Sequence, residues 1–343
     1  MCLWYALHMN TTTYTLECVT WPGLVPALCD ELDELGVRYT THQHAVRMRV
    51  SQPWSLVARL RCAQSAFVLL SFAVPRPKAL LGQQYWDEII AVARDIMRHA
   101  PFTTIELDAA GADSTVMQRI IHSLASTLQL QVVPQDGELQ VRIRPSVAGW
   151  DVLIRMTPRP LGARAWRVCN YPGALNAVVA ASMVRLAGIY ADDRICNVGC
   201  GSATMLIERL LYGPVASAVG CDTQATALAC AQQNVVAAGV AAAVQLYDWD
   251  ATSMPIADHS VDLIIADLPF GQLIGTHVQN QQLYPAIIRE AQRVLSPRGR
   301  MVLISHEIRL LEQSVAQCTG LRVHERMQVQ VGGMAPLIML VQQ

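Results

Sequence analysis

A length of 343 residues is too great for one ordinary compact domain and favours two. Apolar residues make up 52% of the chain and charged residues only 15%, so the chain can bury a large core, and disorder is excluded as its main state. The 26 basic and 27 acidic residues leave a formal net charge of −1, which argues against a strongly basic nucleic-acid-binding protein.

Membrane insertion and metal binding are also disfavoured. Apolar stretches such as Phe67–Val74 are far shorter than the roughly 20 residues that span a bilayer, and the N-terminus lacks the pattern of a signal peptide. The ten cysteines include no C-x-x-C pair. We therefore expect reduced, mostly buried thiols, no metal site, no membrane partner and a cytoplasmic location.

The first half of the chain mixes short strands with amphipathic helices and contains no internal repeat. The pattern predicts strands over Tyr14–Val19, Val46–Val50, Ala66–Phe72, Leu139–Ile143 and Asp151–Met156. It predicts helices over Val25–Glu34, Asp87–Arg98 and Ser114–Leu128. This succession is typical of an α+β region.

Six arginines gather at the end of this half, with a single acid, Asp151, among them. They are Arg142, Arg144, Arg155, Arg159, Arg164 and Arg167. Residues 1–170 carry 16 basic and 14 acidic groups, a net charge of +2, against 10 and 13, or −3, for residues 171–343. The arginines fit a phosphate-binding patch at a domain junction, and an ordinary Arg-rich surface explains them equally well.

From Pro172 onward helices and strands alternate, which predicts an α/β domain with a doubly wound, mostly parallel sheet. The expected helices are Ala174–Leu186, Thr204–Leu211, Thr223–Ala238, Gln281–Leu295 and Ile308–Thr319. The expected strands are Arg194–Val198, Ala216–Cys221, Ala243–Tyr247, Val261–Ala266 and Gly299–Ser305. A final hairpin around Gly332 and Gly333 suggests an antiparallel edge.

Glycine and acidic residues follow the ends of successive strands, where such a sheet places its ligand. Gly199 and Gly201 form a turn between a strand and a helix, so the backbone there can approach a ligand closely. Asp222 ends the next strand, where a carboxylate can accept both hydroxyls of a ribose or simply cap the following helix. Asp250 follows the third strand and can accept from an adenine amino group beside the Trp249 ring, although a plain turn explains it too.

Asp267-Leu268-Pro269-Phe270 directly follows the apolar strand Val261–Ala266. At such a position an Asp carboxylate and a backbone carbonyl can accept both hydrogens of an exocyclic amino group, which turns the nitrogen lone pair toward a methyl donor. An aromatic ring can stack on an extruded base, and proline stiffens the loop. The alternative is a tight turn after a buried strand.

The run from Asn197 to Gly271 resembles the class I S-adenosylmethionine-dependent methyltransferases, and among them those that methylate amino groups. Upstream, Arg164–Arg167, Pro172–Asn176 and Ala180–Ala187 are similar to the segment that leads into the methyltransferase domain of THUMP-domain RNA guanine-N2-methyltransferases. The opening segment Tyr14–Leu24 is similar to theirs as well.

The resemblance implies two regions. The first, residues 1–168, would be an α+β RNA-binding region with a ferredoxin-like part over about 1–85 and a THUMP-like part over about 86–168. The second, residues 169–343, would be a Rossmann-like methyltransferase domain with a mostly parallel seven-stranded sheet and an antiparallel edge. The cofactor would be S-adenosyl-L-methionine and the partner RNA, above all tRNA; whether a protein activator is needed stays open.

The resemblance also implies roles for individual residues. The cofactor would contact Asn197, Gly199, Gly201, Ser202, Asp222, Trp249 and Asp250. The target guanine would be held by Asp267, Leu268, Pro269 and Phe270. If the partner is RNA, the clustered positive charge of the six arginines between Arg142 and Arg167 would contact it.

Three residues depart from the family pattern. Asn197 stands where an acid is usual, Ala203 where a glycine is usual, and Leu268 where proline is commoner. The lost carboxylate predicts weaker binding of a cationic cofactor. Two other functions therefore stay open: a non-catalytic RNA-binding relative, and an amino-methyltransferase that acts on DNA, protein or a small molecule. The intact Asp267–Phe270 motif favours catalysis, and the N-terminal half favours RNA.

Overall fold

The computed structural model describes residues 13–269 and 277–343. Internal contacts divide the chain into two compact units. The first comprises the chain up to Val19 together with Leu32–Leu161, and the second comprises Thr20–Glu31 together with Gly162–Gln343.

The first unit is built on one eight-stranded sheet in the order β2-β3-β1-β4-β8-β7-β5-β6. The strands are β1 Tyr14–Val19, β2 Tyr39–His42, β3 Ala45–Val50, β4 Ser65–Phe72, β5 Thr104–Ala109, β6 Gln131–Val132, β7 Leu139–Ser146 and β8 Gly149–Arg155. Neighbouring pairs from β2 to β7 are antiparallel, whereas β5 pairs in parallel with both β7 and β6. Alternate residues of β7 are buried, as in a sheet with one covered face.

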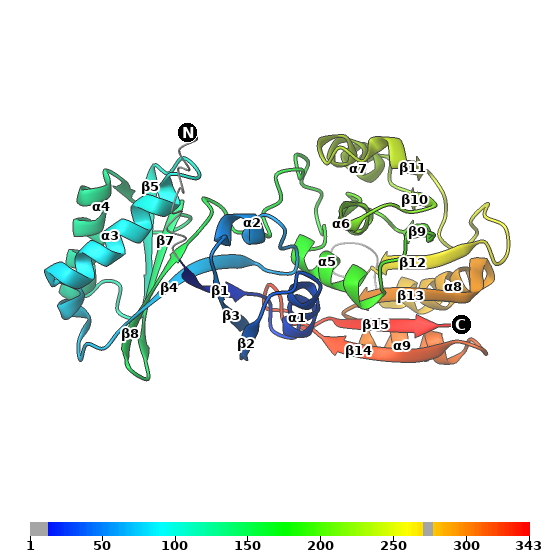
Figure 1. Ribbon diagram of the computed structural model, residues 1–343. Helices are drawn as coiled ribbons and strands as arrows, with labels where there is room; N and C mark the ends of the chain where they lie inside the picture. Colours follow the sequence, from blue (N-terminus) through cyan, green and yellow to red (C-terminus); the bar gives the residue numbers. More distant parts are fainter. Residues whose placement is uncertain (1–12, 270–276) are drawn as a thin grey trace, which may run out of the picture. The chain divides into compact units, whose positions relative to one another are not determined.

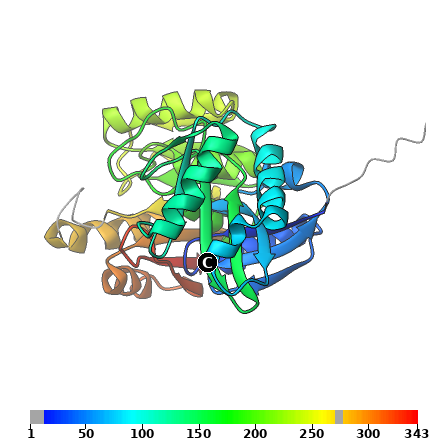
Figure 2. The same cartoon turned by 90° about the vertical axis from the view of Figure 1, so that its left-hand side faces the viewer.

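Helices α3 (Gln83–Met97) and α4 (Thr115–Leu128) lie side by side against this sheet (Figures 1 and 2). The Ser114 side chain accepts a hydrogen bond from the Met117 N–H and so caps the start of α4. Gln129 adopts the left-handed conformation that ends the helix. Two shorter elements of this unit are α2 (Pro53–Val57) and the 3-10 helix η1 (Pro77–Leu81).

The second unit contains a seven-stranded sheet in the order β11-β10-β9-β12-β13-β15-β14. The strands are β9 Arg194–Val198, β10 Ser217–Cys221, β11 Val244–Tyr247, β12 Val261–Asp267, β13 Leu295–Ser305, β14 Arg322–Gln328 and β15 Leu337–Gln342. The five strands from β11 to β13 are parallel, and β15 lies antiparallel between β13 and β14.

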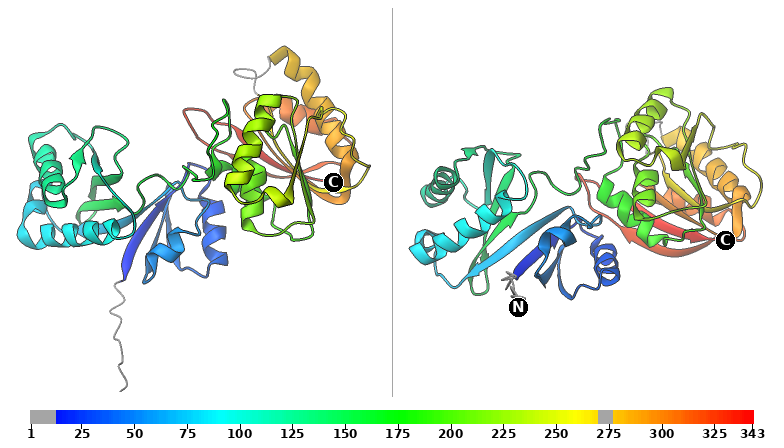
Figure 3. Two further views of the ribbon diagram at one scale, coloured as in Figure 1. Left: turned by 90° about the horizontal axis from the view of Figure 1, so that it is seen from above. Right: turned by 45° about the horizontal axis from the view of Figure 1, so that its top comes forward.

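Helices cover both faces of this sheet (Figures 1 and 3). On one face, helices α5, α6 and α7 share a core with strand residues such as Ile195 and Ile265. On the other, α8 and α9 share a core with the alternate strand residues Cys196 and Ile264. The helices are α5 Ala177–Leu186, α6 Thr204–Tyr212, α7 Ala225–Ala237, α8 His277–Val294 and α9 Ile308–Ala316, with a 3-10 turn η2 at Ala241–Ala243. Burial of both faces explains why these strands are almost continuously apolar in sequence.

Most of helix α1 (Val25–Glu34) belongs to the second unit, although it precedes the main segment of the first. Leu24, just before the helix, is fully buried in the core that also contains Trp166 and Val329. Gly23 has φ of +95°, and a Cβ there would lie 2.1 Å from the Gln328 carbonyl oxygen. Only glycine therefore fits this turn.

The α/β fold with antiparallel strands at one edge, predicted from the sequence, is confirmed. Strands β2, β5 and β6 and helix α2 were not predicted. In β5, Ile105 pairs with Leu139 of β7. The alternation of apolar and polar residues in β5 is weak, so this strand depends more on pairing with a distant strand than on its own sequence. None of the helices described here combines the length and apolar character needed to cross a bilayer.

The expectation of reduced cysteines throughout is wrong at one pair. Cys169 and Cys230 form a disulfide, with Cα atoms 5.4 Å apart. The two residues are 61 positions apart, and no spacing motif marks them, because the fold brings the chain before α5 against α7. Cys196, Cys200, Cys221 and Cys318 are free and buried.

Reduction of this disulfide should destabilise the second unit. A cross-link that closes a 61-residue loop contributes about 4 kcal/mol in the chain-entropy account. We expect dithiothreitol to lower the Tm of the wild type, followed by circular dichroism, and to leave the Tm of a Cys169→Ser/Cys230→Ser variant unchanged. An equal drop in both proteins would contradict this assignment.

Candidate active site

The register of the second sheet brings the ends of four strands to one edge. Val198, the last residue of β9, pairs with Cys221 at the end of β10 and with Ala266 near the end of β12. Cys221 in turn pairs with Tyr247 at the end of β11. The segments that follow these strands therefore begin side by side.

The loop after β9 is a tight turn that requires glycine. Gly199 and Gly201 have φ of +58° and +53°, and a Cβ at either position would meet no atom within 4 Å. Their backbone therefore borders open space. The Cys200 N–H donates to the Cys221 carbonyl at 2.8 Å, which ties the loop to β10. Ala203, where a glycine is usual, is also left-handed with φ of +61° and bears the steric cost of that conformation.

Two carboxylates follow β10 and β11. Asp222 accepts from the N–H of Gly201 and from the N–H of Gln224, each at 2.9 Å and each on a different oxygen. Each oxygen has a second lone pair with which to accept from a ligand. One oxygen of Asp250 accepts from the Thr252 N–H at 2.8 Å and from its hydroxyl at 2.7 Å. The hydrogen bond from the Thr252 backbone, and after it the bond from the Thr252 hydroxyl, lower the pKa of Asp250. This carboxylate therefore stays ionised.

Asp267 is the last residue of β12. Desolvation raises the pKa of its carboxyl to about 7. The next residue, Leu268, is buried, and its N–H donates to the Ile304 carbonyl on β13 at 3.0 Å. The predicted motif continues with Pro269, whereas Phe270 lies outside the described residues.

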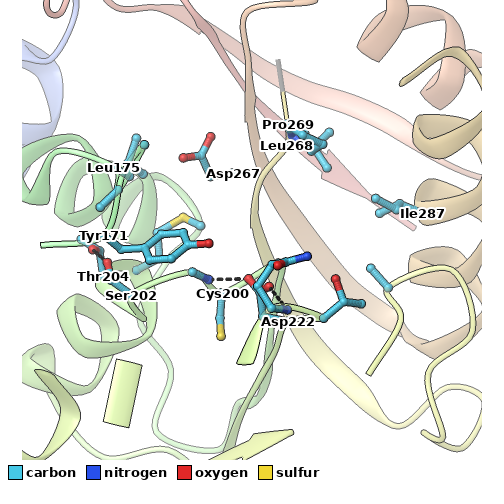
Figure 4. Close-up of a pocket in the computed structure, with 18 of the residues that line it drawn as sticks. Tyr171, Leu175, Cys200, Ser202, Thr204, Asp222, Asp267, Leu268, Pro269 and Ile287 are labelled. Carbon is cyan, nitrogen blue, oxygen red and sulfur yellow. Dashed lines mark hydrogen bonds between the residues drawn. The ribbon is translucent and has the colours of Figure 1, made fainter. Parts of the chain in front are cut away.

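These segments line a cavity of about 350 Å³ (Figure 4). Its size is in the range of small-molecule sites. The sequence-predicted residues that line it are Gly199, Gly201, Ser202, Asp222, Trp249, Asp250, Asp267, Leu268 and Pro269. Figure 4 shows the Tyr171 ring pointing into the same space as the Asp222 and Asp267 side chains.

Sequence reasoning assigned no role to Tyr171 and placed Asn197 at the cofactor. An aromatic residue directly before Pro172-Gly173 is the signal that could have identified Tyr171. Asn197 does not line the cavity. Its side chain is fully buried, and its Nδ2 donates to the Ile265 carbonyl at 3.0 Å, which connects β9 to β12.

Asn234 on α7 is a second residue that the sequence did not single out. It is fully buried, its Oδ1 accepts from the Cys169 N–H at 2.9 Å, and its Nδ2 donates to the Cys169 carbonyl at 3.1 Å. The same Nδ2 also donates to the Ser202 carbonyl at 3.2 Å. Asn234 therefore fixes both the segment before Tyr171 and the glycine loop.

The arginines predicted to contact RNA differ in accessibility. In the first unit, Arg142 and Arg144 are half-buried, and each forms an ion pair with an acid of that unit. Arg155 is buried, and its guanidinium donates to backbone carbonyls of Gly137, Glu138, Thr157 and Pro158. Arg159 is exposed.

The two arginines of the second unit are engaged inside it. The buried Arg164 side chain forms an ion pair with the buried Glu208 at 2.8 Å. Arg167 donates to the Leu175 carbonyl and to the Thr204 hydroxyl, both at 2.8 Å. Leu175 and Thr204 line the cavity, so Arg167 holds two parts of its wall together.

The strand order, the antiparallel β15 and a cavity at the carboxyl ends of the parallel strands define the second unit as a class I methyltransferase fold. The chain belongs to the family of the RMKL-like methyltransferase domain, UPF0020, whose model matches residues 164–336. The resemblance to methyltransferases noted in the sequence is confirmed.

Relatives extend the comparison to the whole chain. A tRNA (guanine(6)-N2)-methyltransferase of Thermus thermophilus is 28% identical over 344 residues, 95% of this chain and 99% of that protein. A protein of the same name from Archaeoglobus fulgidus is 31% identical over 206 residues, 52% of this chain, and the match spans only half of that relative's length. The crystal structure of TrmN from Thermus thermophilus has a TM-score of 0.75 at 21% identity, covering 97% of this chain and all of that one, and shows the same fold.

Asp267 should titrate near neutral pH. We expect its carboxyl ¹³C resonance, in protein labelled at aspartate, to move with a midpoint of about 7 and to be missing from an Asp267→Ala variant. Desolvation disfavours the charged form and so raises the midpoint above the ordinary value of 3.8. A midpoint near 4 would show that water reaches this carboxyl freely.

Proposed function

We propose that this chain transfers a methyl group from S-adenosyl-L-methionine to the N2 amino group of a guanine in tRNA. The observation that carries the proposal is the placement of Asp222 and Asp267 around one cavity, at the carboxyl ends of β10 and β12, the two parallel strands that flank β9. Membership of a methyltransferase-domain family supports the reaction, and the names of the relatives support the substrate.

The residues around the cavity fit this cofactor. Gly199 and Gly201 present backbone to open space that side chains would otherwise fill. The second lone pairs of Asp222 suit the two hydroxyls of a ribose. Trp249 is stacked on Tyr247 at a centroid distance of 4.0 Å and offers its ring to an adenine. When bound, the sulfonium of the cofactor supplies an activated methyl group.

Asp267 has the properties needed to hold the target. As a carboxylate it accepts hydrogens of the guanine amino group, which aims the nitrogen lone pair at the methyl group. A pKa of about 7 means that this accepting form grows with pH through neutrality and that Asp267 can take up the proton which the nitrogen loses. The protein contributes mainly position and partial charge, and no strong base is required.

We propose that the N-terminal region binds the RNA, with a ferredoxin-like part over about 1–85 and a THUMP-like part over about 86–168. Support comes from the Thermus relative, because its similarity extends over 95% of this chain. Arg142, Arg144 and Arg159 remain candidates for phosphate contacts. Arg155 and the Arg164 side chain are buried, and Arg167 donates to two residues of the cavity wall, so these three are assigned to structural contacts instead.

A cytoplasmic location also remains a proposal. The free, buried Cys196, Cys200, Cys221 and Cys318 fit a reducing compartment. The Cys169–Cys230 disulfide does not support it.

The proposal is tested with purified chain, S-adenosyl-L-methionine and unmodified tRNA transcripts. We expect cofactor binding by calorimetry and N2-methylguanosine in the tRNA by nucleoside mass spectrometry. Since the relatives are named for guanine 6, a transcript that carries adenine at position 6 is the matched control and should stay unmethylated. If S-adenosyl-L-methionine does not bind at millimolar concentration, the enzyme proposal fails and a non-catalytic RNA-binding protein is the conclusion. If the chain methylates only other substrates, tRNA is not its substrate.

Two substitutions should separate cofactor binding from target binding. Asp222→Ala removes an acceptor of ribose hydroxyls and should weaken cofactor binding about tenfold to a hundredfold. Asp267→Ala should leave the cofactor Kd nearly unchanged and lower kcat by about a hundredfold or more, because the amino group loses its acceptor. Calorimetry and methyl-transfer assays measure the two effects, and equal loss of both activities in Asp267→Ala would refute its assigned role.

A further inference from the structure

Beside the cavity, side chains of α8 converge on one backbone atom, the carbonyl oxygen of Pro269. Tyr284 Oη donates to this oxygen at 2.7 Å, and Asn280 Nδ2 donates to it at 2.8 Å. The two donors are four residues apart and therefore lie on the same face of the helix. Both are fully buried, and neither lines the cavity.

The hydrogen bonds behind Tyr284 have a single direction. Tyr284 has one hydroxyl hydrogen and gives it to Pro269, so it must accept in its 2.8 Å contact with the Ser305 hydroxyl. Ser305 in turn accepts from the Glu307 N–H at 2.9 Å. Each hydroxyl thus donates once and accepts once, which fixes the Tyr284 hydroxyl on Pro269. Burial raises the pKa of Tyr284, so it remains a donor at neutral pH.

The segment that carries Asp267 is thereby held from two sides. The Leu268 N–H is bonded to β13, and the Pro269 carbonyl is bonded to α8. A carbonyl oxygen has two lone pairs, and two donors already use those of Pro269. Rotation of this segment would leave buried polar groups without partners, which is costly.

We propose that Tyr284 is a positioning residue for methyl transfer: with Ser305 behind it and Asn280 beside it, it sets the orientation from which Asp267 holds the target amino group. This inference rests on the proposed function. Tyr284 acts through Pro269 and has no contact with the cavity. Because a displacement of about 1 Å can cost about a hundredfold in rate, the loss of one hydroxyl should lower kcat without changing cofactor affinity.

The test is Tyr284→Phe, which keeps the ring and removes only the hydroxyl. We expect kcat at saturating tRNA and cofactor to fall about tenfold to a hundredfold, with the Kd of S-adenosyl-L-methionine and the Tm nearly unchanged. Tyr212→Phe is the matched control, because that hydroxyl donates to Glu31 at 3.0 Å, and its kcat should equal that of the wild type. A parallel loss of kcat, cofactor affinity and Tm in Tyr284→Phe would reveal a merely structural role and overturn the proposal.

A double-mutant cycle tests whether Ser305 acts through the Tyr284 hydroxyl. Ser305→Ala removes the donor behind Tyr284 and leaves the bond to Pro269, so its kcat should fall less than that of Tyr284→Phe. The double variant should lose no more than Tyr284→Phe alone, because both changes act through one hydroxyl. Fully additive losses would show that Ser305 does not act through Tyr284.

A measurement without methylation separates this proposal from the proposed function. In Tyr284→Phe the loosened segment admits water to Asp267, so the midpoint of its carboxyl ¹³C titration should fall from about 7 toward 3.8. If the wild type methylates no tRNA, the proposed function fails while this shift still shows that Tyr284 orients the segment. An unchanged midpoint overturns the positioning role even in an active enzyme.

Discussion

The pairing of β9 with β10 on one side and with β12 on the other is the constraint on which the site depends. Val198 is in register with both Cys221 and Ala266, so Asp222 and Asp267 leave the sheet at the same edge. The ladder hydrogen bonds that set this register are covered by helices on both faces, and a buried backbone group that loses its partner is costly. The positions of the two acids are therefore determined by backbone pairing between the strands.

Side chains distant in sequence supply the rigidity that the loops at this edge lack. Asn234 fixes the chain at Cys169 together with the glycine loop, and Arg167 joins two parts of the cavity wall. Tyr284 does the same for the Asp267 segment from the opposite face of the sheet. Each of these side chains donates to backbone carbonyls, so the shape of the cavity and the stability of the unit depend on the same hydrogen bonds.

The sequence predicted the second sheet because its signals are local: an apolar strand ends, a glycine or acid follows, and a helix begins. Gly201, Asp222 and Asp267 were found from such patterns, and the structure places them around one cavity. The family resemblance placed Asn197 at the cofactor, whereas its side chain is bonded to the Ile265 carbonyl inside the sheet and does not line the cavity. A count of charges does not distinguish an exposed Arg159 from a buried Arg155. The partners of Asn234 and Tyr284 could not be predicted, since those contacts exist only once the chain is folded.

The discontinuity of the second unit has a consequence for biosynthesis. Thr20–Glu31 belongs to this unit but leaves the ribosome before the whole of Leu32–Leu161, and long before the β14–β15 region against which Leu24 packs. The intervening unit has its own sheet and can fold while the nascent chain is still growing. The apolar start of α1 therefore lacks its final core neighbours until the β14–β15 region has been synthesised. Completion of the catalytic unit is thus tied to the arrival of the last strands, so an incompletely translated chain cannot complete its core.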